Sequence, residues 1–161
     1  LSKQFGETLI GLVGGDSAIF RVASLFGVRG ASGKGGNFVE TMIRAGRERG
    51  ALKVVDDQWM SPTSTAFIAG AVLDFLERGG AAGVYHCVNG GATTWRRFAE
   101  AIVARAGVAA TVTPCGSDEW PTPARRPAYS ALDNGKLAGV IGPIPPWEEA
   151  LDAYLKAKGH A

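Results

Sequence analysis

Two adjacent arginines, Arg125 and Arg126, stand on a stretch stiffened by Pro121, Pro123 and Pro127. A guanidinium group carries a fixed fork of N–H donors that matches two oxygens of one phosphate. Because proline restricts the backbone, such a loop loses little conformational entropy when a ligand binds. The pair therefore predicts a phosphate or diphosphate site, with Arg126 favoured over Arg125. Ordinary surface charge is the alternative interpretation.

A second candidate anion site is the start of a predicted helix. Residues 28–36 contain four glycines, which predicts a loop without regular structure. Asn37 and Phe38 then open an amphipathic helix predicted over 37–50. The unpaired N–H groups and the positive dipole end of a helix N-terminus suit a phosphate oxygen. A plain N-cap explains Asn37 equally well.

Composition and charge exclude several other classes of site. The chain has 161 residues, a formal net charge of +2 and no long run of one sign, so the charge pattern of a nucleic-acid binder is missing. No stretch reaches the roughly 18 apolar residues that cross a bilayer, and no signal segment opens the chain, which predicts a cytoplasmic protein without a membrane partner. Cys87 and Cys115 fit no zinc-binding spacing and are predicted to be reduced and buried. His86, in an apolar strand, and His160, at a frayed terminus, are not predicted to bind a metal or to catalyse.

The elements that position these residues alternate between helix and strand. Residues 18–27 form an almost continuous apolar run, which is typical of a strand buried on both faces of a parallel sheet. The alternation predicts an α/β fold built on parallel strands, in one partial domain without an internal repeat. Helices are predicted at 2–15, 37–50, 64–80, 93–107 (capped by Thr93 or Thr94), 132–139 and 145–159, and strands at 18–27, 51–59, 83–91 and 108–116.

The residues also carry a resemblance to the extended short-chain dehydrogenase/reductases, and within them to the dTDP-4-dehydrorhamnose reductase branch. It rests on the segments LSKQFGE, IFRVASLFG, GNFVETMIRAGRERGALKVVDDQWMSPTSTAFIA, GVYHCVNGGATTWRRFAEAI and PTPARRPAYSALDNGKL. The resemblance implies the C-terminal half of a Rossmann-type NAD(P)-binding fold with a smaller substrate-binding lobe. It assigns 1–30 and 64–92 to the Rossmann core, and 31–63 and 93–161 mainly to the substrate-binding lobe.

The same resemblance gives Lys3 a catalytic and cofactor-binding role. Lys3, in a Ser-Lys-x-x-Gly-Glu context, matches the lysine of the family's Tyr-x-x-x-Lys pair, whose side chains share one helix face. In the family this lysine hydrogen-bonds the nicotinamide ribose and lowers the pKa of the tyrosine acid. The tyrosine would precede Leu1, and the glycine-rich pyrophosphate turn is absent, so we expect the 161-residue fragment to be inactive alone. An exposed helix lysine is the alternative.

Further site residues are carried over from the family pattern. Val22 is expected beside the nicotinamide, and Ser24, where well-known rhamnose-forming relatives have Trp, is expected to face both cofactor and substrate. Asp56 and Asp57 are equally well explained as a solvated strand end. The expected substrate-binding residues are Ser24, Asn37, Phe38, Gln58, Arg126 and Arg125.

The function that the resemblance implies is an NAD(P)H-dependent reductase of a nucleotide-linked 4-keto sugar, most simply dTDP-4-dehydrorhamnose. Its cofactor would be NADPH or NADH, and its partner a dTDP-linked keto sugar, with a homodimer as an open arrangement. A non-catalytic regulatory or binding homologue of the same fold is one alternative. A sugar-nucleotide epimerase or dehydratase is another.

Overall fold

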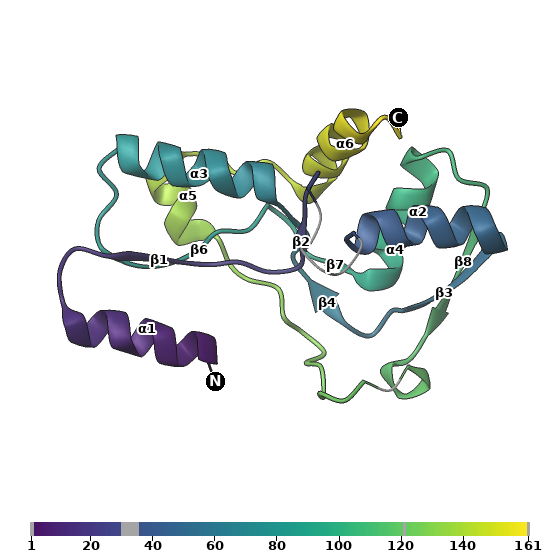
Figure 1. Ribbon diagram of the computed structural model, residues 1–161, viewed down its shortest axis with the longest axis horizontal. Helices are drawn as coiled ribbons and strands as arrows, with labels where there is room; N and C mark the ends of the chain where they lie inside the picture. Colours follow the sequence, from purple (N-terminus) through teal and green to yellow (C-terminus); the bar gives the residue numbers. More distant parts are fainter. Residues whose placement is uncertain (1, 30–35, 121, 161) are drawn as a thin grey trace.

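Helices and strands alternate along the chain, as the sequence predicts (Figure 1). The computed structural model describes residues 2–29, 36–120 and 122–160, so most of the predicted glycine-rich loop lies outside the described residues. The helices are α1 (Ser2–Val13), α2 (Phe38–Arg49), α3 (Thr65–Glu77), α4 (Trp95–Arg105), α5 (Gly135–Ile141) and α6 (Trp147–Lys158), with a 3₁₀ turn η1 (Ser117–Glu119). The strands are β1 (Ala18–Arg21), β2 (Leu25–Phe26), β3 (Ala51–Val55), β4 (Trp59–Met60), β5 (Thr63–Ser64), β6 (Gly83–His86), β7 (Thr93–Thr94) and β8 (Thr111–Cys115).

The strands pair mostly in parallel, which confirms the predicted α/β class. β1 pairs with β6, β2 with β5, and β3 with β8, all in parallel register. The short pair of β4 and β7 is antiparallel, so the prediction of parallel strands holds for three of the four strand pairs in the described residues. Each parallel pair joins strands separated by a helix, as parallel connections require.

The predicted strand over 18–27 is wrong in two respects. It breaks after Arg21, and Ser24 adopts a positive φ of 46°, a left-handed conformation that is uncommon for a residue with a side chain. At this turn the chain leaves β6 as its partner and joins β5 through β2. The run is also not buried on both faces, because Ala18, Ile19 and Phe20 are only partly buried and Leu25 is exposed.

Local capping signals fix where two of the helices begin. The side chain of Asn37 accepts a hydrogen bond from the backbone N–H of Glu40 at 3.2 Å, and Gly50 ends α2 with a φ of 66°. Thr94 accepts from the backbone N–H of Arg97 at the start of α4. These contacts confirm the N-cap prediction for Asn37 and select Thr94 over the residue before it.

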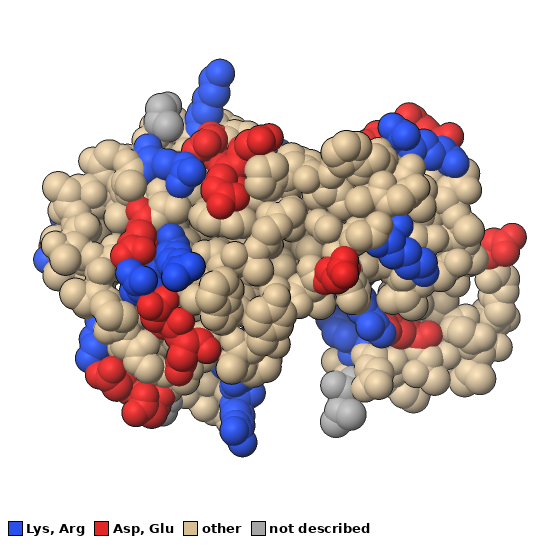
Figure 2. Space-filling model, turned by 180° about the vertical axis from the view of Figure 1, so that it is seen from behind, with Lys and Arg blue, Asp and Glu red and all other residues tan. Residues whose placement is uncertain are grey.

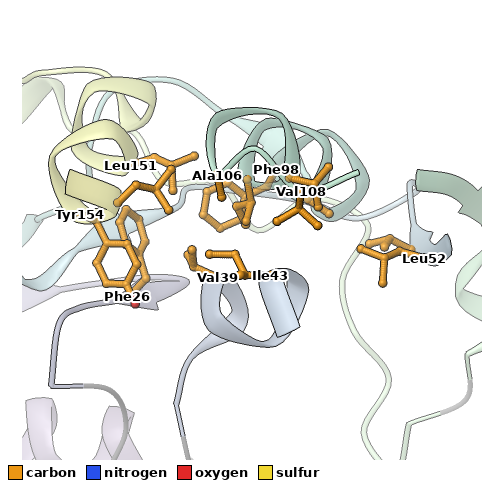
Figure 3. Packing of buried hydrophobic residues seen from close by; sticks show 14 of the residues in the cluster. Phe26, Val39, Ile43, Leu52, Phe98, Ala106, Val108, Leu151 and Tyr154 are labelled. Carbon is orange, nitrogen blue, oxygen red and sulfur yellow. The ribbon is translucent and has the colours of Figure 1, made fainter. Parts of the chain in front are cut away.

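Two hydrophobic clusters divide the molecule into two lobes. The larger cluster joins α2, α4 and α6 to β3, with Phe26, Phe98 and Leu151 almost fully buried (Figure 3). The smaller cluster joins α3 and α5 to β6 and includes Phe75 and Tyr85. In Figure 1 the smaller lobe lies on the left and the larger on the right. The smaller cluster draws on α5, which the sequence assigned to the substrate-binding lobe, and the domain division stays a prediction.

Helix α1 is attached to the smaller lobe through an ion pair. Arg21 donates two hydrogen bonds to the carboxylate of Glu7, at 3.0 and 2.6 Å. The helix runs antiparallel to β1 (Figure 1). Its apolar side chains are largely exposed, including Phe5, Leu12 and Val13.

Candidate functional site

The loop that carries Arg125 and Arg126 is fixed at both of its ends. At its far end, Trp59 of β4 donates a backbone hydrogen bond to Ala128 at 2.8 Å and accepts one from Ser130 at 2.9 Å. At its near end, η1 docks on the segment after β3 through Ser117 and its neighbours. The loop is therefore held on one side by η1 and on the other by its backbone hydrogen bonds to β4.

The near anchor centres on Ser117. The carboxylate of Asp57 accepts hydrogen bonds from the Ser117 backbone N–H at 3.0 Å and from its hydroxyl at 2.6 Å. These bonds hold the pKa of Asp57 below its ordinary value. The amide of Gln58 donates to the same hydroxyl at 2.8 Å. Gln58 thus lies beside the loop, with one amide hydrogen already used to anchor it.

Arg125 and Arg126 are exposed on this anchored loop. Within residues 2–29, 36–120 and 122–160, neither makes a salt bridge or a side-chain hydrogen bond. Two cations without an internal carboxylate are available to an anionic ligand. Pro121, the first proline of the loop, lies outside the described residues.

Asp56 differs from the sequence prediction of a solvated strand end. It is half-buried, and it accepts hydrogen bonds from the Thr94 hydroxyl at 2.5 Å and from Arg96 Nε at 2.7 Å. Burial alone would raise its pKa, but the bonds from Thr94 and Arg96 outweigh it and the net pKa is lowered. Asp56 therefore fixes the start of α4 to the end of β3.

Lys3 lies at the end of α1 that approaches the carboxyl edge of β1. Glu7, one turn further along, is bonded to Arg21 at that edge. Since a helix rises about 1.5 Å per residue, Lys3 lies about 6 Å beyond Glu7, in the direction of residues 22–24. Lys3 is exposed and has no side-chain partner within the described part of the chain.

Val22 and Ser24 occupy the irregular segment that follows β1. Val22 is 40% exposed, and Ser24 is half-buried with its backbone carbonyl accepting from Thr63 at 3.2 Å. Strained backbone of this kind is typical of ligand-binding positions. The edge that Lys3 approaches therefore presents a small side chain and an apolar one.

The helix start at Asn37 and Phe38 is less open than the sequence suggests. The Asn37 amide donates to the Gly27 carbonyl and to the Tyr154 hydroxyl, both at 3.1 Å, so both of its hydrogens have internal partners. The Phe38 ring packs against Trp95, with ring centroids 4.7 Å apart. This helix start can offer a ligand the backbone N–H groups that precede Glu40, because the N–H of Glu40 already donates to the Asn37 side chain.

A polar cluster that the sequence analysis missed joins α2 to the C-terminal helix. Tyr154 donates to Glu40 Oε1 at 2.5 Å, His160 Nε2 lies 3.1 Å from Glu40 Oε2, and Lys158 Nζ lies 3.9 Å from Oε1. Burial alone would raise the pKa of Glu40, but the hydrogen bonds from Tyr154 and His160 and the nearby charges lower it overall. Burial and the Glu40 contact raise the pKa of Tyr154 to about 12.

This cluster corrects the prediction that His160 lies at a frayed terminus, because its ring is held against Glu40 and its backbone N–H donates to Leu155. A hollow of about 410 Å³ adjoins the cluster, lined in part by Arg29, Arg44 and Lys158. The sequence held a signal for the α2 side of this cluster, because Asn37 and Glu40 are three residues apart at a helix start, the spacing of a capping box.

The structure also places Cys87, Cys115 and His86. Cys87 and Cys115 are buried free thiols, as predicted. Nδ1 of His86 donates to the Asp133 carbonyl at 2.9 Å. Within the described ranges there is no cluster of metal-binding side chains and no helix long and apolar enough to cross a membrane.

The arginine loop and Lys3 belong to different lobes, and a notch separates those lobes. Figure 2, seen from behind, shows this notch between α1 at the lower right and the larger lobe at the left, with basic side chains on both of its sides. In Figure 1 the N-terminal end of α1 and the loop after η1 both border the same open side.

Comparison with known proteins assigns the chain to a family. The family model described as "RmlD substrate binding domain" matches residues 1–159. The spore coat polysaccharide biosynthesis protein SpsK of Bacillus subtilis is 35% identical, over 99% of this chain and 54% of that protein. The dTDP-4-dehydrorhamnose reductase of Burkholderia thailandensis is 38% identical, over 96% of this chain and 56% of that protein.

A solved structure gives the same result for the fold. The dTDP-4-dehydrorhamnose reductase of Bacillus anthracis, in complex with NADP, superposes with a TM-score of 0.84 at 33% identity, over 97% of this chain and 54% of that one. The fold therefore places the chain among the Rossmann-type α/β proteins. More specifically, the chain belongs to the RmlD substrate-binding domain family. It spans about half the length of the curated relatives it matches.

Proposed function

We propose that this chain forms the substrate-binding part of an NAD(P)H-dependent reductase that acts on a nucleotide-linked 4-keto sugar, most simply dTDP-4-dehydrorhamnose. The observation that carries the proposal is the family match over residues 1–159. Relatives named as dTDP-4-dehydrorhamnose reductases, one of them solved with NADP, support the substrate and the cofactor. A cytoplasmic location and a homodimer stay predictions.

The ligand would lie across the notch between the lobes. Arg126, with Arg125 beside it, would hold the diphosphate, because a guanidinium fork matches phosphate oxygens and the loop is anchored before binding. Gln58, at the anchor of the loop, would lie near the nucleotide. The backbone N–H groups at Asn37 and Phe38 would contribute the positive end of the α2 dipole.

The reacting end of the ligand would lie at the carboxyl edge of β1. NADPH or NADH supplies a hydride to the keto carbon when it is bound. Lys3 would donate to a ribose hydroxyl and place a positive charge next to the proton donor, which favours the ionised form of a phenol. Val22 would pack on the nicotinamide, and Ser24 would face both cofactor and sugar.

Calorimetric titration of the full chain with a dTDP-sugar tests the diphosphate site. A charge-assisted hydrogen bond contributes about 1.5–3 kcal/mol, so Arg126→Ala is expected to weaken binding by about 10- to 150-fold. Arg125→Ala is the matched control from the same loop and is expected to weaken binding less. Unchanged affinity in Arg126→Ala would refute this placement. Because the 161 residues are expected to be inactive alone, NAD(P)H consumption with a dTDP-4-keto sugar is to be measured on a longer chain that supplies the residues before Lys3. There it distinguishes a reductase from an epimerase or a binding homologue.

A further inference from the structure

An aromatic row made of Trp59 and Tyr129 lies at the edge of the larger lobe, next to β7. Trp59 of β4 is paired with Thr94 of β7 on one side and bridged to Tyr129 on the other. The bridge is made by the two backbone bonds that anchor the arginine loop. Because side chains at paired positions point to the same face of a sheet, Tyr129 and Trp59 lie next to each other on one face.

This face points away from the hydrophobic core. Met60, the next residue along β4, is 1% exposed and belongs to the larger hydrophobic cluster. Successive side chains of a strand point to opposite faces, so Trp59 faces outward. Tyr129 is 66% exposed, and in the described part of the chain its hydroxyl has no hydrogen-bond partner and its ring contacts no other ring.

A cation fixes the indole of this row. The guanidinium carbon of Arg97 lies 5.4 Å from the centre of the Trp59 ring, in a cation–π contact. Arg97 starts from the first turn of α4, whose N-terminus Thr94 caps. The row thus has a held indole, an open phenol ring beside it and a positive charge at its side, a surface that attracts a planar, electron-rich ring.

The position of the row relative to the arginines indicates which end of a ligand it would hold. Tyr129 follows Arg126 by three residues, a stretch that spans at most about 11 Å. The proposed function places the sugar of the ligand at the other lobe, beside Lys3 and Ser24. The opposite end of the ligand lies beyond the diphosphate, on the side of β4, and this end is the base of the nucleotide.

We propose that Tyr129 and Trp59, with Arg97, form a stacking platform for the base of the nucleotide-linked ligand. This inference rests on the proposed function, because it takes the diphosphate to lie on Arg125 and Arg126. The phenol ring stacks on the base, and the indole and the guanidinium complete the surface. Affinity for the base therefore depends on the ring of Tyr129 and not on its hydroxyl.

The test compares two ligands, dTDP and inorganic pyrophosphate, on the full chain. Base stacking is lost in Tyr129→Ala, which is expected to weaken dTDP binding by about 5- to 150-fold and to leave pyrophosphate binding unchanged. Tyr129→Phe keeps the ring and is expected to bind dTDP like the wild type. Trp120→Ala is the matched control, because Trp120 is 60% exposed near the start of the same loop but is not in the row. Quenching of the Trp59 fluorescence by dTDP, absent in Trp59→Phe, gives a second readout.

The outcomes separate this inference from the proposed function. Unchanged dTDP affinity in Tyr129→Ala, together with weakened binding in Arg126→Ala, overturns the platform and leaves the diphosphate site standing. Equal weakening of dTDP and pyrophosphate in Tyr129→Ala assigns the effect to the loop or to the phosphates and also overturns the platform. If the wild type binds neither ligand, the proposed function fails and the platform with it.

Discussion

Removing the hydroxyl group of Tyr154, in the variant Tyr154→Phe, is expected to destabilise the larger lobe by about 1.5–4 kcal/mol. The hydroxyl donates to the Glu40 carboxylate at 2.5 Å and accepts from the Asn37 amide at 3.1 Å. A hydrogen bond to a charged group contributes about 1.5–3 kcal/mol, and a part-buried donor left without an acceptor adds up to about 1 kcal/mol. The variant removes one oxygen atom, so loss of packing contributes little.

Tyr85→Phe is the matched control for this experiment. Tyr85 and Tyr154 are both 4% exposed, but the Tyr85 hydroxyl donates to a neutral backbone carbonyl, that of Ala81, at 2.9 Å. A neutral hydrogen bond contributes about 1 kcal/mol. The difference between the two variants therefore reports the combined effect of the bonds to the Glu40 carboxylate and the Asn37 amide.

Urea unfolding of the wild type and the two variants gives the free energies of unfolding. Tyr154→Phe is expected to lose at least about 0.5 kcal/mol more than Tyr85→Phe, with an unchanged dependence on urea concentration. The double variant Glu40→Gln/Tyr154→Phe is expected to lose less unfolding free energy than the sum of the losses in the two single variants, since the two groups share one bond. Equal losses in the two tyrosine variants, or strict additivity with Glu40→Gln, would contradict this account.

Two further outcomes are expected. Glu40 has a pKa below its ordinary value of 4.5 in the folded chain, so its contribution to stability is present above pH 4.5 and is lost as the pH falls through the folded pKa. Between pH 7 and pH 3, Glu40→Gln should therefore lose less unfolding free energy than the wild type. A Cβ at Gly27 would lie 2.0 Å from Thr65 Oγ1, so Gly27→Ala should destabilise the fold by about 1–3 kcal/mol. Gly70→Ala in α3, where nothing lies within 4 Å of the added Cβ, should be neutral or stabilise by up to about 1 kcal/mol. Thermal unfolding compares the two variants, and a Gly27→Ala variant as stable as the wild type would argue against the close contact.

Local sequence patterns predict most of the helices and two of their caps, because a cap depends on residues within one turn. Asn37 and Thr94 each bond to a backbone N–H three residues further on. The break after β1 was not predicted, since an apolar run does not show that its second half pairs with a different strand. Ser24 can take its positive φ only because the flanking strands pair with β6 and β5.

The contacts around the candidate site depend on residues that lie far apart in the sequence. Tyr154 and Glu40 are 114 residues apart, and no periodic pattern connects a helix start with a C-terminal helix. The bridge between Trp59 and Tyr129 also joins residues that lie far apart in the sequence. By contrast, Arg125 and Arg126 were found from residue type and neighbouring prolines alone, and the structure adds that the loop holding them is anchored at both ends.

The two cysteines give the molecule one natural reporter in each lobe. Cys87 is fully buried in the smaller cluster, and burial raises the pKa of its thiol to about 11. Cys115 ends β8 in the larger lobe, and burial also raises its pKa. A thiol-reactive reagent labels a buried, protonated cysteine only when the surrounding structure opens. The labelling rates of Cys87 and Cys115 therefore time the opening of each lobe separately, and a ligand that bridges the lobes should slow both rates together.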